Sequence, residues 1–252
     1  MAGIERAAKV VSAPARATAC AIANPMPRLA PATKHVLPAR IIFVEYPELG
    51  HTVGMPVAVE APQEFVIPPH KLWTREECSV LESSGLLDLE RFELIEGKLI
   101  PKMPKNPPHS RALKLLVKWL EDLFGRDFIL PESSIDLRPE DNPTNEPEPD
   151  VLVLTVPFLD LAPGARPCPQ ELRLVAEISC STLAFDLTAK ARLYARSGIA
   201  EYWVLDVQGR RLLIHRDPAG DGYGSVLAYG EHEYVRTLDA PSTEVRVGEF
   251  LK

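Results

Sequence analysis

The spacing of apolar and polar residues divides the chain into an irregular beginning and a regular remainder. Residues 1–62 are rich in Ala and Pro and show no sustained hydrophobic period, which predicts a mostly disordered N-terminal extension. Regular patterns begin near Thr74. The length of 252 residues is enough for one large domain or two small ones, and we assign residues 63–252 to one folded domain.

Three segments of this domain have the period or the end signals of helices. They cover residues 74–84, 109–124 and 186–197. Thr74 and Asp186 are the expected N-caps of the first and third helices, and Gly85 and Gly198 follow their ends. In the second segment, leucines recur at helical spacing on one side and basic residues lie on the other, which predicts an amphipathic helix.

Short runs of apolar residues between turn signals predict the strands. They lie at about residues 92–95, 98–100, 151–156, 172–178, 202–205, 212–215, 223–228 and 245–247. Glu96-Gly97 and Gln208-Gly209 are the expected hairpin turns. This order of helices and strands predicts an α/β domain of the mixed α+β kind, built on one sheet.

The candidate chemistry starts from a carboxylate inside an apolar run. Glu177 lies near the end of residues 172–178, where burial costs free energy unless the side chain is paired or binds a metal. If this strand pairs antiparallel with residues 151–156, Asp150 comes to the same edge. Two carboxylates and a backbone carbonyl near Ile178 would suit Mg²⁺. Such an ion polarises a phosphate and lowers the pKa of a bound water.

Two further groups are candidates for the same site. Lys190 follows Glu177 by thirteen residues in the predicted helix, and its long side chain can return to the strand end. There the ammonium would orient the attacking water or neutralise developing charge. Glu93 or Glu96 would add a third carboxylate from the upstream hairpin.

Each of these residues also has an ordinary structural explanation. Asp150 after a proline is typical of a turn, and Lys190 is typical of a solvated helix face. Glu177 could be an edge-strand carboxylate paired with Arg192. The functional interpretation depends on their joint position at strand ends and helix starts, where sites form.

A local basic patch surrounds the start of the second helix. Its members are Lys98, Lys102, Lys105, Arg111, Lys114 and Lys118. Lys102, Lys105 and Arg111, together with His109, are the candidate contacts to a nucleic-acid backbone. A solvated helix face is the alternative for the lysines, and a simple helix-start residue is the alternative for His109.

Bulk composition limits the possible partners and location. The net charge is −7, so no global basic field attracts nucleic acid, and any contact must be local. The four cysteines form no CxxC pair, which favours a reduced, cytoplasmic setting. No apolar run is long enough to cross a bilayer, so we expect no membrane association.

These motifs resemble a known family. The run Phe92–Leu99 is similar to the opening motif of the Uma2-type restriction endonucleases, which belong to the PD-(D/E)XK nuclease superfamily. Glu148–Val151 resembles the family's Pro-Asp strand start, and His109 falls where the family often has a histidine. The longest signature is matched by Val175–Ser179, Asp186, Lys190, Tyr194, Gly198 and Glu201–Val204. The resemblance covers about residues 74–217.

The resemblance implies a restriction-endonuclease-like core, with a mixed central β-sheet flanked by helices. It implies metal binding by Asp150 and Glu177, with Glu93 as the upstream acid. In the superfamily a lysine often lies two residues after the glutamate, where this chain has Ser179, so the lysine role passes to Lys190. A homodimer is expected on resemblance alone. Cys180 departs from the family pattern without removing a core residue.

Three functions fit these observations. The first is a DNA endonuclease, dependent on Mg²⁺ or Mn²⁺, that hydrolyses phosphodiester bonds through a metal-activated water. The second is a catalytically silent nucleic-acid-binding or interaction module on the same fold. The third is a metal-dependent hydrolase of a small nucleotide, which a narrow pocket rather than an open groove would favour.

Overall fold

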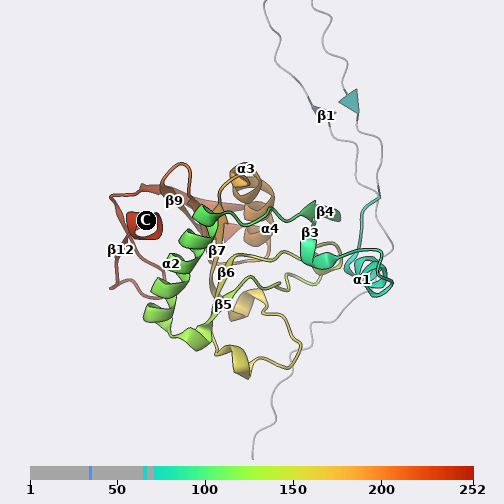
Figure 1. The fold of residues 1–252 in the computed structure, drawn as a ribbon, viewed down its shortest axis with the longest axis horizontal. Coiled ribbons are helices and arrows are strands. Elements are labelled where there is room, and N and C mark those ends of the chain that lie inside the picture. The colour runs from blue at the N-terminus through green and yellow to red at the C-terminus, as the bar shows by residue number, and fades with distance from the viewer. Residues whose placement is uncertain (1–33, 36–64, 67–70) are drawn as a thin grey trace, which may run out of the picture.

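The computed structural model describes residues 34–35, 65–66 and 71–252 (Figure 1). The predicted disordered extension, residues 1–62, lies outside the described residues except at β1 (Lys34–His35). This short strand pairs antiparallel with β2 (Phe65–Val66).

Six strands of the described chain form one mixed sheet, in the order β10-β9-β8-β7-β6-β5. They are β5 (Ile129–Pro131), β6 (Val151–Leu154), β7 (Leu172–Ser179), β8 (Glu201–Asp206), β9 (Arg211–Ala219) and β10 (Gly222–Gly230). Neighbours are antiparallel except β7 and β8, which are parallel. A parallel pair needs a crossover connection, and a helical segment supplies it. The predicted mixed central sheet and the antiparallel β6–β7 pair are confirmed.

The helical elements flank this sheet. They are α1 (Arg75–Ser83), α2 (Pro107–Phe124), α3 (Leu183–Phe185), the π-helical turn η6 (Asp186–Lys190) and α4 (Ala191–Arg196). The 3₁₀ turns are Leu89–Arg91, Arg126–Phe128, Asn142–Thr144, Phe158–Asp160, Pro169–Glu171 and Val247–Phe250. None of the helices in the described part of the chain combines the length and apolar character needed to cross a membrane.

The first two predicted helices are confirmed, with one shifted start. Thr74 and Glu77 form the reciprocal capping box that begins α1. The helix α2 begins at Pro107, two residues before the expected position, because the Asn106 side chain accepts a hydrogen bond from the His109 amide.

The third predicted helix has a different beginning. The prediction that Asp186 caps it is wrong, because the helical segment already starts at Leu183, with Thr182 in the N-cap position. Asp186 lies one turn inside, and its carboxylate accepts a hydrogen bond of 2.6 Å from the Thr182 hydroxyl. From Asp186 to Lys190 the backbone winds as a π-helix before α4 continues.

Alternation along the strands gives the sheet two apolar faces. The face under α2 includes Val151, Val153, Leu174, Ala176, Trp203 and Leu205, against which Ala112, Leu116 and Leu120 of α2 pack. The face under α4 includes Leu152, Leu154, Val175, Tyr202 and Val204, against which Leu193 and Tyr194 of α4 pack. Successive side chains of a strand point to opposite faces, so Glu177 lies on the same face as Val175, under α4.

The upstream hairpin stands apart from the main sheet, which corrects the expectation of one sheet. Its strands β3 (Phe92–Ile95) and β4 (Lys98–Pro101) pair only with each other as a ladder, as do β11 (Tyr234–Val235) and β12 (Val245–Arg246). Figure 1 shows the hairpin beside α4. The turn is the predicted Glu96-Gly97, where both residues have positive φ.

An aromatic cluster fills the space between α4 and the strands β8, β9 and β10. The rings of Tyr194 and Tyr202 meet edge to face at 4.9 Å, and His215 packs against Tyr202 and Tyr223. His215 is buried and its Nδ1 atom has no hydrogen-bond partner among the described residues. Burial lowers the pKa of the His215 imidazole.

We expect His215 to make folding sensitive to acid. Because its pKa is lower in the folded chain, the unfolded chain takes up the proton more readily. Stability is therefore retained above the ordinary histidine pKa of about 6.5 and falls as the pH decreases below it. Urea unfolding at pH 7.5 and pH 5.5 measures the free energy of unfolding at each pH. The decrease in this free energy at pH 5.5 should be smaller for His215→Phe, which keeps a ring in the cluster, than for the wild type. An equal loss in both proteins would contradict this prediction.

Candidate active site

The centre of the site is the buried pair of Glu177 and Lys190. Glu177 lies on β7 under the helical segment, and Lys190 is the last residue of the π-helical turn. The Lys190 ammonium donates to Oε1 of Glu177 at 2.8 Å, and both side chains are about 95% buried. The alternative of an edge strand paired with Arg192 is wrong, since β7 is an inner strand and Arg192 is exposed.

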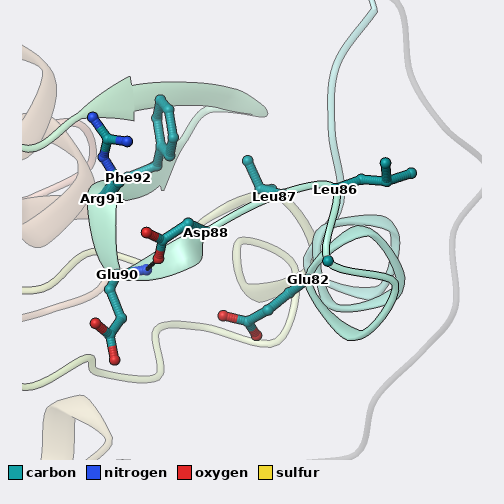
Figure 2. Close-up of a pocket in the computed structure, with 8 residues that line it drawn as sticks. Glu82, Leu86, Leu87, Asp88, Glu90, Arg91 and Phe92 are labelled. Atoms are coloured by element: carbon teal, nitrogen blue, oxygen red, sulfur yellow. Dashed lines mark hydrogen bonds between the residues drawn. The ribbon is translucent and has the colours of Figure 1, made fainter.

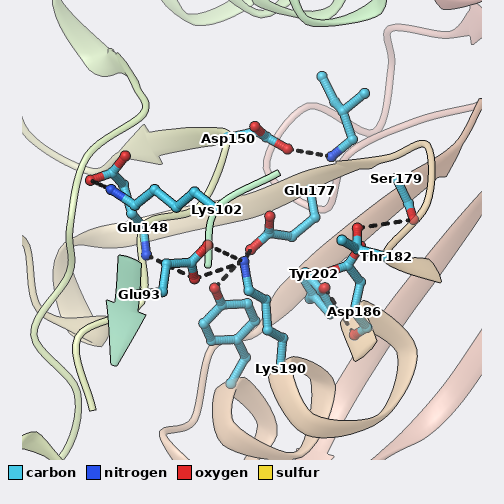
Figure 3. Close-up of polar contacts among 12 residues, drawn as sticks. Glu93, Lys102, Glu148, Asp150, Glu177, Ser179, Thr182, Asp186, Lys190 and Tyr202 are labelled. Atoms are coloured by element: carbon cyan, nitrogen blue, oxygen red, sulfur yellow. Dashed lines mark hydrogen bonds and ion pairs between the residues drawn. The ribbon is translucent and has the colours of Figure 1, made fainter. Parts of the chain in front are cut away.

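Glu93 joins this pair from the separate hairpin. Its carboxylate pairs with the same Lys190 ammonium, with Nζ–O distances of 3.1 and 2.9 Å to its two oxygen atoms. The other predicted upstream acid, Glu96, lies at the hairpin turn and binds Arg196 instead. Figure 3 shows the Lys190 ammonium between the carboxylates of Glu93 and Glu177. One cation therefore joins two acidic side chains that are 84 residues apart in the sequence.

Burial and charge set the protonation of this group. Burial raises the pKa of the Glu177 carboxyl well above its ordinary value, and the nearby Asp186, Asp150 and Glu93 raise it further, while Lys190 acts in the opposite direction. Burial alone would lower the pKa of Lys190, but the carboxylates of Glu177, Glu93 and Asp186 outweigh it, so the pKa is raised and the ammonium stays charged.

Asp150 reaches the site from the position just before β6, the strand beside β7, as the antiparallel register predicts. Its Oδ2 atom accepts a hydrogen bond of 2.6 Å from the Ile178 amide. Its Oδ1 atom lies 3.1 Å from Nε2 of His109, at the start of α2. The hydrogen bond to Asp150 raises the pKa of His109, and burial partly opposes it. The predicted residues Glu93, Asp150, Glu177, Lys190 and His109 therefore all meet at one place.

The fit of this place to Mg²⁺ can be judged from its donors. Among the described residues, no group of three or more His, Cys, Asp and Glu side chains is arranged closely enough to hold a metal ion. Both Glu93 and Glu177 are paired with the Lys190 ammonium. Asp150 and Glu177 nevertheless line the same cavity, and one or two carboxylates completed by water suit Mg²⁺. These carboxylates have the donor chemistry that Mg²⁺ requires, and metal binding by Asp150, Glu177 and Glu93 stays a prediction.

The predicted phosphate contacts lie on the rim, and the chain's own acids already bind two of them. Lys102 donates to Glu148 at 2.8 Å, and Lys105 forms an ion pair with Glu132. Lys102, Lys105 and His109 line the cavity. Arg111 is exposed on α2 and is not among the lining residues, so the structure does not bring it to the site.

Sequence reasoning missed several groups around the cavity. Tyr194 donates its hydroxyl hydrogen to Oε1 of Glu177 at 2.9 Å, although the sequence analysis used it only as part of a motif. Asp186 lines the cavity with its carboxylate bound by Thr182, and Glu132 and Glu148 hold the rim lysines. The spacing of Lys190 and Tyr194, four residues apart on one helix face, is the signal that could have revealed Tyr194.

A second hollow lies on the surface beside α1, with a volume of about 640 Å³. Figure 2 shows its labelled carboxylates, Glu82, Asp88 and Glu90, pointing in different directions. It shares no lining residue with the cavity at Glu177. Since its ionisable groups do not converge, we assign the chemistry to the Glu177 cavity.

Removing the central cation should destabilise the fold strongly. In Lys190→Met, two buried carboxylates lose their counter-charge, and breaking such a pair costs about 3–5 kcal/mol. Adding Glu177→Gln removes one of the unpaired charges, so the double variant should recover part of the loss, with a coupling of about 1–3 kcal/mol. Urea unfolding in the presence of a chelator measures both values. If the losses of unfolding free energy were strictly additive, the contact between Lys190 and Glu177 would contribute nothing to stability.

Comparison with known proteins adds the family. The family model Uma2, described as "Putative restriction endonuclease", matches residues 79–247. No curated protein matches the sequence. One solved structure with a similar fold is "a putative nuclease belonging to DUF820" from Anabaena variabilis. It is 16% identical, with 68% of this chain and 95% of that chain covered and a TM-score of 0.51. At that identity the likeness shows the fold alone, whereas the family match spans most of the chain. The chain belongs to the Uma2 family.

Proposed function

We propose that the protein is a Mg²⁺- or Mn²⁺-dependent endonuclease that hydrolyses phosphodiester bonds in DNA. One observation carries the proposal: three carboxylates and a lysine from separate segments meet at one cavity. They are Glu93 on β3, Asp150 before β6, Glu177 on β7 and Lys190 on the π-helical turn. The family description and the nuclease-like fold support a nuclease.

Asp150 and Glu177 are the proposed ligands of the ion. When bound, the ion would polarise the scissile phosphate and lower the pKa of a water. Asp150 is already fixed in orientation by the Ile178 amide, and His109 lies against its other oxygen. A ligand held by hydrogen bonds in this way needs little reorganisation when a cation binds.

Lys190 is the proposed source of fixed positive charge. Its surrounding carboxylates raise its pKa, so it remains an ammonium throughout the working pH range. A charged donor in a buried site stabilises the negative charge that develops on a phosphate far more than it would in water. Lys190 also holds Glu177 in place, so it supports both the ligand and the reacting phosphate.

The rim residues Lys102, Lys105 and His109 are the proposed contacts to the DNA backbone. Because Glu148 and Glu132 now bind the two lysines, DNA phosphates have to compete with these carboxylates. With a net charge of −7, the protein has little general attraction for DNA. Binding should therefore be weak and strongly dependent on salt.

The size of the cavity separates DNA from a small-nucleotide substrate. Its volume is about 120 Å³, below the roughly 300–1,000 Å³ of typical small-molecule pockets. That space suits an ion, waters and one phosphate group, with the rest of the substrate outside. It gives no support to enclosure of a whole nucleotide. A cytoplasmic location and a homodimer remain predictions from the cysteine content and the family resemblance.

The first test is cleavage. Purified protein with plasmid DNA and Mg²⁺ or Mn²⁺ should produce nicked circles, and Asp150→Asn should reduce the rate at least about 100-fold. Loss of second-shell groups alone costs about 10–100-fold, so loss of a ligand should cost more. Quantitative gel electrophoresis measures the rates.

The matched control is Asp122→Asn, an exposed carboxylate on α2 that pairs with Lys118 away from the cavity. It should cleave like the wild type. Nicking by Asp150→Asn at the wild-type rate would contradict the proposed site. DNA binding without metal and without cleavage by any form would favour the catalytically silent module.

The second test concerns the rim. In the double variant Glu132→Gln/Glu148→Gln, Lys102 and Lys105 are released for phosphates, so DNA affinity should rise about 3- to 10-fold at low salt. The slope of log Kd against log salt should steepen by up to about 2, one for each lysine that gains a phosphate. Fluorescence anisotropy with a labelled oligonucleotide in chelator measures both.

A variant of equal charge controls for general attraction. Glu244→Gln/Glu249→Gln also removes two acids, each of which forms an exposed ion pair with arginine or lysine. It should change the salt slope little. If it matches the rim variant, the gain comes from net charge, and Lys102 and Lys105 are not the phosphate contacts.

A further inference from the structure

Tyr194 is the buried polar group at the site that the proposed function leaves unused. It lies on α4, fully buried, and its hydroxyl donates to Oε1 of Glu177 at 2.9 Å. The Lys190 ammonium donates to the same oxygen at 2.8 Å. Both of these hydrogen bonds to Glu177 therefore end on one oxygen atom. Figure 3 shows the other oxygen of Glu177 turned away from the Lys190 ammonium, towards Asp150.

The backbone brings the two donors to one face. Lys190 closes the π-helical turn, and Tyr194 follows one α-helical turn later, so the two side chains lie above each other. The turn is held from the sheet, because the Tyr202 hydroxyl donates to the Asp186 carbonyl at 3.1 Å. The Tyr202 ring also packs edge to face on Tyr194 at 4.9 Å. Tyr194 consequently has little freedom to move its hydroxyl away from Glu177.

The two donors differ in what they do to a cation. Lys190 adds a positive charge that repels a metal ion near Glu177, whereas the neutral Tyr194 hydroxyl adds a hydrogen bond without such repulsion. A carboxylate fixed at one oxygen by two donors has its second oxygen fixed in direction as well. That second oxygen is the one available to the cavity shared with Asp150.

We propose that Tyr194 is a positioning residue: together with Lys190 it fixes Oε1 of Glu177, so that Oε2 is presented to a divalent cation shared with Asp150. The inference rests on the proposed metal site and adds the group that orients its buried ligand. It assigns Tyr194 no contact with the substrate.

The test is metal binding in the absence of DNA. Tyr194→Phe removes the hydroxyl and keeps the ring against Tyr202. Mn²⁺ titration, followed by the electron paramagnetic resonance of the free ion, should give a Kd about 10- to 100-fold weaker than the wild-type value. Asp150→Asn, which removes a proposed ligand, should weaken binding more.

Tyr223→Phe is the matched control. Its hydroxyl donates to the Ile199 carbonyl at 3.0 Å in the same aromatic cluster, away from Glu177. Both tyrosine variants lose one hydrogen bond and keep the ring, and only Tyr194→Phe should change the Kd for Mn²⁺. A metal affinity that falls equally in both variants would show a structural effect and overturn the inference.

The remaining outcomes separate this inference from the proposed function. If Tyr194→Phe binds Mn²⁺ like the wild type while Asp150→Asn does not, the metal site stands and the role of Tyr194 is overturned. If the wild type binds no Mn²⁺, both the metal site and the role of Tyr194 are overturned. Should Tyr194→Phe fail to fold, Tyr202→Phe releases the π-helical turn that leads into α4 and Tyr194, and it should weaken Mn²⁺ binding more than Tyr223→Phe does.

Discussion

Glu177 places a carboxylate on a sheet face that a helical segment must cover, and that burial has to be compensated before the two layers can close. The compensation comes from the covering segment itself, since Lys190 and Tyr194 both donate to the carboxylate. The polar contact therefore sits inside an apolar interface, between β7 and α4. Leucine and valine side chains could pack these layers in several registers, but only one register brings both donors onto Glu177. The site thus helps to define the fold around it.

The Lys190 ammonium also anchors the hairpin β3–β4, which lies outside the main sheet. The hairpin β3–β4 has no strand partner in that sheet, yet Glu93 binds Lys190 and Glu96 binds Arg196 at the other end of α4. These two ion pairs fix the hairpin against the helical segment, and the Asn145 side chain holds the hairpin turn from another side by accepting a hydrogen bond from the Glu96 amide. Glu93 can enter the cavity only because the hairpin is held in this position.

The sequence predicts the parts of this structure that depend on local patterns. Helix periods, glycine stops and the turn at Glu96-Gly97 follow from neighbours in the chain. The antiparallel pairing that brings Asp150 to the edge beside Glu177 joins separate strands, and no local pattern fixes it. The misplaced cap at Asp186 has a physical reason: its carboxylate binds the Thr182 hydroxyl, four residues earlier, inside a helical segment already under way. No local pattern distinguishes that use of Asp from an N-cap.

Contacts that depend on the third dimension could not be predicted in this way. The pairing of Lys102 with Glu148 and of Lys105 with Glu132 joins residues that only the folded chain brings together. The separation of the hairpin from the main sheet likewise depends on packing, because its strands have the same apolar pattern as true sheet strands. Tyr194 was visible as a motif residue, but its hydroxyl acquires a partner only once α4 lies on β7.

The π-helical turn makes the length of this segment critical. A residue inserted into an α-helix rotates everything beyond it by about 100°, and the wider turn absorbs one such residue. A further residue inserted between Asp186 and Lys190 has no second wide turn to absorb it, so it would rotate Tyr194 by about 100° relative to the segment before it. Substitutions at Leu187, Thr188 and Ala189 leave this spacing unchanged, whereas an insertion does not. Among family members with a working site, the spacing from Asp186 to Tyr194 should therefore not increase, whatever residues stand at positions 187–189.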